Sequence, residues 1–359
     1  MVGRFFKFSL YLTCAALMLA PLPVYAQCTS PAGVAGENGY NLTGSGEMEY
    51  CDGSSWISMN NSSVTIGATL VGHWKLDETT ATTTAADSSG YGNDGTMTGM
   101  TGSANTVTAK VSTGLDFDGS TDYIEVLGNP SEYQITGSIS AAAWVKADSW
   151  PEIKHIVSKQ GNGGASNNYG WRLATSGGSS PFNFGVSETG ATMIDRRSAT
   201  IPEVGKWYHV AGVYDASSQT IDIYINGQLD NGTLTGTVPS SQNDSSVNVF
   251  IGRRSGGGRF FDGIIDDVRI YDNTLNASDI AILSICTKPG ELGYDFANHV
   301  LLWCDDNLDA YTTGTAGAGG GGCAASGSKA AGVEGTMQYD TANNKMVFCD
   351  GANWVDIPN

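Results

Sequence analysis

Positive charge is scarce in this sequence. The 359 residues include 18 Lys and Arg against 36 Asp and Glu, so the formal net charge is −18. A chain this acidic cannot hold nucleic acid through bulk electrostatic attraction, so we expect no nucleic-acid partner. We interpret most of the carboxylates as solvated surface groups.

Long hydrophobic runs are absent after the first 26 residues, so we expect no membrane insertion. The first 26 residues combine Arg4 and Lys7, the apolar run SLYLTCAALMLAPLPV and a small-residue site at Ala26. These features predict a signal peptide over 1–26 that is cleaved near Ala26. The mature protein is then secreted, extracellular or periplasmic, and Gln27 before the next cysteine argues against a lipid anchor.

Cysteine is limited to seven residues, one of which leaves with the signal peptide. An even number in an exported chain predicts disulfide bonds. The six are Cys28, Cys51, Cys286, Cys304, Cys323 and Cys349. Each of three similar segments contains one of them and has another shortly upstream, so the simplest pairing is Cys28–Cys51, Cys286–Cys304 and Cys323–Cys349.

The three segments form a repeat that brackets the centre of the chain. They read GENGYNLTGSGEMEYCDGSSW, GELGYDFANHVLLWCDD and GTMQYDTANNKMVFCDGANW. Alternating residues and Asp-Gly turns predict a small β-meander in each copy, stapled by its disulfide. We place the copies at 27–60, 286–306 (truncated) and 323–359, with a Gly-rich linker at 307–322. They resemble hairpins of exported bacterial surface and fibre-like proteins, which suggests a spacer or cap.

Residues 65–285 predict one all-β domain. About eleven short alternating runs are separated by Gly, Asn, Asp and Ser turns, which is typical of a two-sheet antiparallel sandwich. Isoleucines at 221, 223 and 225 face one side of a strand, and Asn226-Gly227 predicts a type I′ turn. The single helical pattern, NASDIAILSI, begins at Asn276.

The motifs of this domain occur in a specific order: VGHWKLDE, DSSGYGNDG, GLDFDGSTDYIEV, SISAAAWVKA, KWYHVAGVYD with IDIYINGQ, and FDGIIDDVRIYDNTLNASDI. This ordered set resembles the laminin G-like branch of the concanavalin A-like lectin/glucanase superfamily. The resemblance covers most of the mature chain. It implies a jelly roll of two curved sheets that binds carbohydrate or protein outside cells, with a structural calcium in many members.

We find no catalytic motif. Glucanases of this fold carry Glu-x-Asp-x-x-Glu on one strand, which this chain lacks, and Asp266 and Asp267 are expected to point to opposite faces. The four histidines do not stand in zinc or triad spacing. His209 alternates with core residues, so we interpret it as a hydrogen-bonded strand residue and the protein as a non-enzyme.

Calcium is the one cofactor that the sequence suggests, because it binds carboxylate and amide oxygens. The loop from Asp87 to Asn93 is rich in such oxygens, and Asp118 lies in a similar turn. By alternation Asp266 shares an apolar face with Ile264, Val268 and Ile270, where a cation would offset its burial. The alternative is that these residues only cap turns.

Two arginine-rich loops form the candidate ligand site. Guanidinium groups suit the carboxylate or sulfate of acidic glycans, and aromatic rings nearby could stack on sugars. The candidates are Arg196, Arg197, Arg253, Arg254, Arg259, Trp150, Tyr169 and Trp171. The alternative is that each arginine pairs with a local aspartate and that the tryptophans are core residues.

These observations favour a secreted, non-enzymatic protein that recognises glycan or another extracellular polymer. The alternative is a structural or adhesive component of a surface layer or fibre, which uses the sandwich to contact surface proteins. An unrecognised glycoside-active enzyme is disfavoured by the missing acid pair.

Overall fold

The computed structural model describes residues 66–150, 153–162, 168–176 and 181–285 with their side chains, and beyond them only the backbone of short strands. The chain divides into two compact units. One is Ile66–Ser284, and the other combines Met1–Thr65 with Ile285–Asn359. The predicted domain spanned 65–285.

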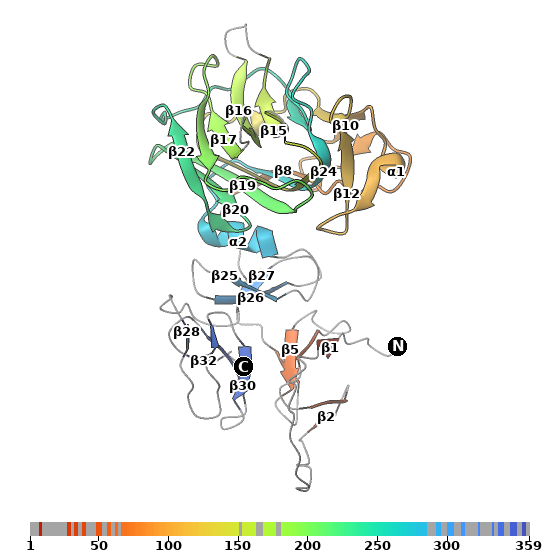
Figure 1. Cartoon of the computed structure of the whole chain (residues 1–359), viewed down its shortest axis with the longest axis vertical. Coiled ribbons are helices and arrows are strands. Elements are labelled where there is room, and N and C mark those ends of the chain that lie inside the picture. The colour runs from red at the N-terminus through yellow and green to blue at the C-terminus, as the bar shows by residue number, and fades with distance from the viewer. Residues whose placement is uncertain are drawn as a thin grey trace. The chain divides into compact units, whose positions relative to one another are not determined.

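The Ile66–Ser284 unit is a sandwich of two antiparallel sheets (Figure 1). The nine-stranded sheet has, in spatial order, β22 (Asn231–Thr235), β18 (Ile194–Ser198), β17 (Phe182–Val186), β16 (Tyr169–Thr175), β15 (His155–Gln160), β23 (Val249–Ile251), β13 (Tyr123–Val126), β10 (Gly95–Thr98) and β9 (Thr84–Ala85). The prediction of an all-β, two-sheet antiparallel fold is confirmed.

The eight-stranded sheet has, in spatial order, β11 (Thr106–Thr108), β12 (Thr113–Asp118), β24 (Asp262–Tyr271), β14 (Ile139–Ala147), β19 (Tyr208–Asp215), β20 (Thr220–Ile225) and β21 (Gln228–Leu229). Its eighth strand, β8 (Leu70–Trp74), also pairs with β24. Two short helices, α1 (Gly102–Asn105) and η1 (Ser131–Tyr133), lie in the connections.

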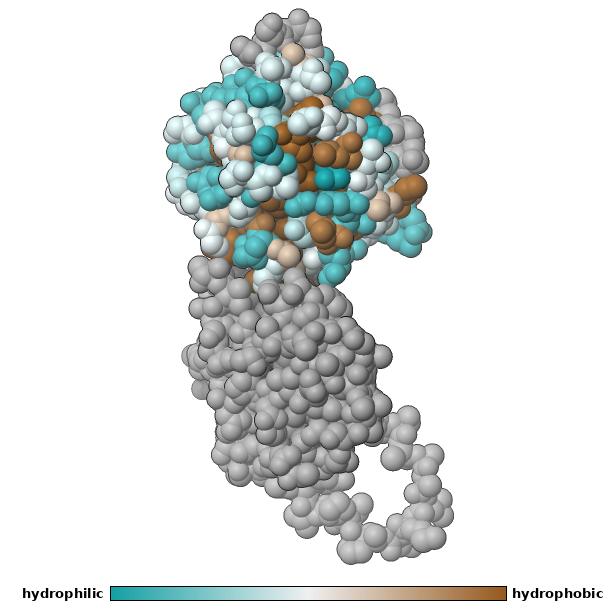
Figure 2. All heavy atoms as spheres, turned by 90° about the vertical axis from the view of Figure 1, so that its left-hand side faces the viewer, coloured by the Kyte–Doolittle hydropathy of each residue, from teal (hydrophilic) through white to brown (hydrophobic). Residues whose placement is uncertain are grey.

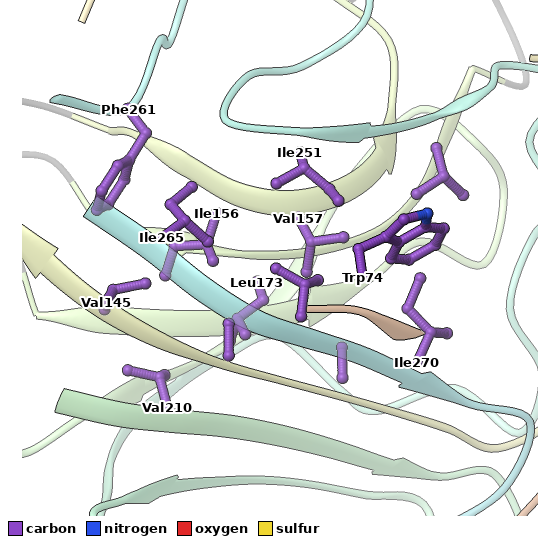
Figure 3. Close-up of a cluster of buried hydrophobic side chains, with 14 of the residues drawn as sticks. Trp74, Val145, Ile156, Val157, Leu173, Val210, Ile251, Phe261, Ile265 and Ile270 are labelled. Atoms are coloured by element: carbon purple, nitrogen blue, oxygen red, sulfur yellow. The ribbon is translucent and has the colours of Figure 1, made fainter. Parts of the chain in front are cut away.

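The core fills the space between the two sheets. Figure 3 shows Val145, Val210, Ile265 and Ile270 of the eight-stranded sheet meeting Ile156, Val157, Leu173 and Ile251 of the nine-stranded sheet. Burying one such side chain contributes about 1.5–3 kcal/mol relative to exposing it. The packing is close: a methyl group on Gly212 would lie 2.0 Å from Cγ of Phe184, which belongs to the opposite sheet.

Local sequence signals account for strand β20 and its turn. Ile221, Ile223 and Ile225 all enter the core, as the alternation predicts. Asn226 and Gly227 have φ of 51° and 81°, so the predicted type I′ turn is confirmed.

The predicted helix is α2 (Ala277–Ile285). It begins with a reciprocal cap, because the N–H of Asp279 donates to Oδ1 of Asn276 while the N–H of Asn276 donates to Oδ2 of Asp279 (3.0 and 2.9 Å). Ile280 and Leu283 pack on the outer face of the eight-stranded sheet, the side away from the nine-stranded sheet (Figure 1). Among the described residues, no helix is both long and apolar enough to cross a membrane.

Strand β24 contains a β-bulge that the sequence pattern did not reveal. Its pairing with β14 shifts between Trp144, which faces Asp266, and Ala142, which faces Arg269. Asp267 sits in this bulge with φ of 52°. The expected shared face of Asp266, Val268 and Ile270 is therefore wrong: Val268 and Ile270 enter the core beside Ile265, whereas Asp266 does not.

The three repeats form short strands whose backbones are described. The first copy pairs β4 (Asn38–Tyr40), β5 (Met48–Cys51) and β6 (Trp56–Ser58), and the third pairs β30 (Met337–Asp340), β31 (Lys345–Cys349) and β32 (Trp354–Asp356). These are the predicted meanders. The smaller pairs are β1 (Lys7–Phe8) with β4, β2 (Gln27–Thr29) with β3 (Ala32–Val34), and β28 (Gly322–Cys323) with β29 (Gly332–Val333).

The second repeat is longer than expected. β25 (Leu292–Asp295) and β26 (Val300–Cys304) are joined by β27 (Ala310–Thr312), which lies within the predicted linker and pairs with β7 (Ser62–Ser63). Ala-Tyr-Thr of β27 therefore adds a third strand to this meander beyond the predicted boundary at residue 306. The cysteine side chains, and residues 1–26 apart from β1, lie outside the described residues, so the disulfides and the signal peptide stay predictions.

Candidate ligand-binding face

The outer face of the nine-stranded sheet is mostly polar. The strand registers align one residue from each strand: Thr84, Thr96, Glu125, Phe250, Ser158, Arg172, Gly185, Asp195 and Thr235. The neighbouring positions, among them Ile124, Val157 and Leu173, are core residues. Because side chains alternate along a strand, the aligned residues face away from the core.

Arg172 and Asp195 tie three strands together on this face. Nη2 of Arg172 lies 2.9 Å from both carboxylate oxygens of Asp195, and its Nε donates to Asn183 (3.1 Å). The intervening residue on β17 is Gly185, where a methyl group would lie 2.2 Å from Oδ1 of Asp195. The missing side chain therefore allows the ion pair to cross the strand.

A loop of residues 252–260 brings three more arginines to the same face. The N–H of His155 donates to the carbonyl of Arg259 (3.1 Å), and the hydroxyl of Ser158 donates to the carbonyl of Arg253 (3.3 Å). The guanidinium carbon of Arg253 lies 3.3 Å from the ring centre of Tyr123 and 4.9 Å from that of Phe250. Such cation–π contacts hold a guanidinium flat against the sheet.

The imidazole of His155 lies close to these cations. Burial holds the pKa of His155 well below its usual value, and the positive charges of Arg172, Arg254 and Arg259 lower it further. Burial also lowers the pKa of Arg254, with the charge of Arg259 acting in the same direction. His155 is therefore a neutral residue whose Nδ1 lies 2.9 Å from the hydroxyl of Ser158.

Arg197 completes the set from β18. It is aligned with Asn183, whose neighbours Phe182 and Phe184 are core residues, so Arg197 points outward. Its Nε is buried without a hydrogen-bond partner, as is Nε of Arg253. We call Arg172, Arg197, Arg253, Arg254 and Arg259 the arginine face. The row of aligned residues described above crosses the arginine face and contributes two carboxylates, Glu125 and Asp195. The five arginines therefore exceed these carboxylates by three, although the chain as a whole is strongly acidic.

Three of the predicted ligand residues do not belong to this face. Arg196 points toward the other sheet and donates to the carbonyls of Ile221 and Gly232 (2.9 and 3.2 Å), because adjacent strand residues face opposite sides. Trp171 is 1% exposed within the core. Trp150 packs edge-on against Phe182 and Phe261, so neither tryptophan can stack on a sugar.

Tyr169 is retained in the candidate site. It begins β16 and is half-buried. It lies close enough to Arg254 to oppose the lowering of the Arg254 pKa by burial and by Arg259. Among the predicted residues, the structure therefore brings together Arg197, Arg253, Arg254, Arg259 and Tyr169 (the last at the edge of the arginine face).

The predicted calcium ligands do not form one cluster. Gly114 of β12 packs against Asp266, and Asp118 lies four residues further along the same strand. At the usual rise per residue of a strand, Asp118 is therefore about 13 Å from Asp266. No three His, Cys, Asp or Glu residues gather in a metal-binding arrangement within the described part of the chain.

Hydrogen bonds already fill the carboxylates of the two loops. Asp87 accepts the N–H groups of His73, Ser89 and Asn93 and the hydroxyl of Ser89. Asp118 accepts three N–H groups and two hydroxyls from residues 120–122. These bonds lower the pKa of both carboxyls despite the opposing effect of burial. The residues fit turn caps rather than a calcium site.

Asp266 and Asp267 share a face, contrary to the expectation from alternation. The bulge turns both toward the outer side of the eight-stranded sheet, where Nε2 of His73 lies 2.6 Å from Oδ1 of Asp267 and Nη2 of Arg269 lies 3.1 Å from its Oδ2. His209 lies beside them as a buried strand residue. His299 lies outside the described residues.

Sequence reasoning missed Arg172, Asp195, Tyr123 and Phe250. Arg172 alternates with Trp171 and Leu173 in GWRLAT, so the pattern could have identified it as the outward residue of a buried strand. The pairing with Asp195 and the stacking on Tyr123 could not be identified, because they depend on the order of strands in the sheet.

The comparisons agree with this architecture. Residues 118–281 match the family described as the concanavalin A-like lectin/glucanases superfamily. No curated protein matches the chain. Several solved structures are similar to this chain at low identity.

Domain 4 of AbnA, an extracellular arabinanase of Geobacillus stearothermophilus solved with arabinotriose, is 20% identical (TM-score 0.45) over 60% of this chain and 98% of that domain. The botulinum neurotoxin DC binding domain, solved with SialylT, is 17% identical (0.45) over 64% of this chain and 54% of that one. A Trypanosoma rangeli sialidase mutant is 17% identical (0.41), and the match covers 60% of this chain and 32% of the sialidase. The two-sheet sandwich and the family match together show that residues 118–281 are a domain of the concanavalin A-like lectin/glucanase superfamily.

Proposed function

We propose that this protein is an exported, non-enzymatic binding protein whose arginine face recognises carbohydrate or another extracellular polymer. One observation carries the proposal: five arginines converge on one face of a chain with a net charge of −18. Nε atoms of Arg197 and Arg253 are buried there without partners. A buried donor that lacks a partner costs free energy, so a ligand that supplies an acceptor removes this cost and binds more tightly.

The chemistry of the arginine face favours an acidic polymer. Guanidinium groups bind carboxylate and sulfate through paired hydrogen bonds, and Arg253 is held in place by the ring of Tyr123. Arg172 is already satisfied by Asp195, so it supports the site rather than contacting the ligand. The residues available to the ligand are Arg197, Arg253 and Arg254.

A polysaccharide-array screen of the purified chain tests the proposal. Arg197→Gln and Arg254→Gln are each expected to reduce the signal on uronate-containing or sulfated glycans about tenfold, the loss of one charge-assisted hydrogen bond. Lys206→Gln is the matched control, because Lys206 is exposed and pairs only with its neighbour Glu203. No signal on any polymer, or equal loss in all three variants, would refute the role of the arginine face.

The structural calcium stays a prediction from the resemblance. The described aspartates offer it no ligand set, so the binding proposed here is expected to survive EDTA. The same array with and without EDTA measures this, and loss of signal in EDTA would reveal a metal held by other residues.

A second candidate function, contact with a surface protein, rests on an apolar patch. Ile201, Val204 and Leu229 are 57, 59 and 57% exposed. The N–H of Thr200 donates to Asp230 (2.9 Å), which holds the Ile201 loop beside Leu229. Figure 2, which views the side of the sandwich where β20 and β22 lie, shows apolar residues gathered among hydrophilic ones. Self-association that Leu229→Ser abolishes, with no glycan signal, would favour this alternative.

A further inference from the structure

Three buried polar atoms without partners lie in one row on the outer face of the eight-stranded sheet. Asp266 of β24 faces Trp144 of β14, and Trp144 faces His209 of β19. These residues are 0, 4 and 2% exposed. Oδ1 of Asp266, Nε1 of Trp144 and Nδ1 of His209 each lack a hydrogen-bond partner. Buried polar atoms are nearly always paired, so three adjacent exceptions are unusual.

The neighbouring groups are satisfied, so the row is a distinct feature. Asp267 has both oxygens occupied by His73 and Arg269. Asp267 also adopts φ of 52°, a conformation that costs a non-glycine residue free energy. Bulges and strained residues of this kind are concentrated at functional sites.

A turn covers one end of the row. The N–H groups of Lys110 and Val111 donate to Oδ2 of Asp266 (3.0 and 2.7 Å). Nζ of Lys110 lies 4.9 Å from the centre of the Trp144 ring. The adjacent Gly114 has no side chain, and a methyl group there would lie 3.0 Å from Cβ of Asp266. The ammonium group is therefore held over the row by the Lys110 turn.

The available groups can all act as donors. The indole N–H of Trp144 and the ammonium of Lys110 can only donate. Burial raises the pKa of Asp266 to about 8, so its carboxyl is neutral at physiological pH. Since Oδ2 accepts two N–H groups, the proton resides on Oδ1, which then donates. Burial lowers the pKa of His209 to about 3, so the imidazole is neutral and can donate through Nδ1.

We propose that the row Asp266–Trp144–His209, closed by the Lys110 turn, is a second binding site, for the carboxylate of a small acid. A carboxylate supplies up to four acceptor positions and a negative charge opposite Lys110. A neutral carboxyl can donate to an anion that an ionised one would repel, a principle known from other sites that keep an acid protonated. This site lies on the other sheet from the arginine face and does not depend on it.

The indole ¹H–¹⁵N spectrum of the full chain tests this site directly. The cross-peak that disappears in Trp144→Phe, which keeps an aromatic ring but loses the N–H, belongs to Trp144. Titration with acetate and with glucuronate is expected to move that peak saturably, whereas acetamide and glucose, the neutral analogues, leave it in place. If neither acid moves the Trp144 peak saturably, the proposal is overturned, and water is then the partner of these polar atoms.

Variants separate this site from the arginine face. Lys110→Met is expected to weaken acetate binding about tenfold or more, the loss of one charged donor. Asp266→Asn keeps a donor in place of the protonated oxygen, so it retains binding. Arg254→Gln is the matched control, since it removes a charge from the opposite sheet and leaves the Trp144 shift unchanged. Equal weakening in Lys110→Met and Arg254→Gln would contradict a local site.

Discussion

Replacing Asp266 by asparagine is expected to stabilise the sandwich at neutral pH. The carboxyl is fully buried, and one oxygen accepts two N–H groups while the other has no partner. Asparagine has the same shape and can present its oxygen to the same two N–H groups. It differs in carrying no charge at any pH, so it removes only the contribution of ionisation.

The magnitude follows from the raised pKa of Asp266, about 8 against 3.8 in the unfolded chain. The folded protein retains a proton that the unfolded chain releases, so the wild-type free energy of unfolding falls as pH rises through this interval. The loss is below about 1 kcal/mol near pH 4 and on the order of 4 kcal/mol near pH 7. The Asp266→Asn variant should not show this loss of stability with rising pH.

Hydrogen exchange of the β14 and β24 amides measures the effect in the sandwich alone, without contribution from the flanking unit. The slowest amides report global opening of this unit. Exchange free energies of the variant and the wild type are compared between about pH 4 and pH 8. Every other titrating group is common to the two proteins and cancels in the difference.

The expected difference is small at acid pH and grows in favour of the variant toward neutrality. A difference that is constant across this range would refute the reasoning, because it would mean that the Asp266 pKa is not raised. A variant that becomes less stable with rising pH would show that the ionised carboxylate has a cation partner, which the described residues do not supply.

Three further predictions concern other contacts. Gly185→Ala should displace the carboxylate of Asp195, cost about 1–3 kcal/mol of stability and reduce acidic-glycan binding, as melting curves and the array would show. Asp267→Asn should cost about 3–5 kcal/mol, because it leaves two buried basic partners uncompensated. The pKa of Asp267 is lowered despite burial, chiefly by Arg269, so this loss should begin to shrink below about pH 4, where the unfolded chain takes up a proton while the folded carboxylate stays ionised. Gly212→Ala should cost about 1–3 kcal/mol through collision with an aromatic ring of the opposite sheet; an unchanged melting temperature would contradict each of the three.

Individual strands were predictable because their signal is local. The isoleucines of β20, the Asn226-Gly227 turn and the cap at Asn276 each depend on residues within a few positions of one another. Alternation also correctly indicates that Trp171 could belong to the core. It fails in β24, where one extra residue at Asp267 reverses the face of everything that follows.

The candidate site was only half predictable for the same reason. Composition identified the two arginine-rich segments, and residue chemistry indicated acidic ligands. The prediction of two loops was wrong for Arg196 and Arg197, which lie on strand β18. Arg196 was assigned to the wrong side because adjacent residues of a strand diverge, and Arg172 was missed because a lone arginine in a strand carries no distinctive signal.

By itself the sequence determined the all-β class, the arrangement of repeats around a central domain and the resemblance that the family match confirms, since these follow from periodicity, turn residues and motif order. Only the tertiary structure decided which charges meet. The order β18, β17, β16, β15, β23 brings Arg197, Arg172 and Arg253 to one face although they are far apart in the chain. The bulge in β24 leaves Oδ1 of Asp266 buried without a hydrogen-bond partner. Both outcomes depend on pairing between distant strands, which no local pattern encodes.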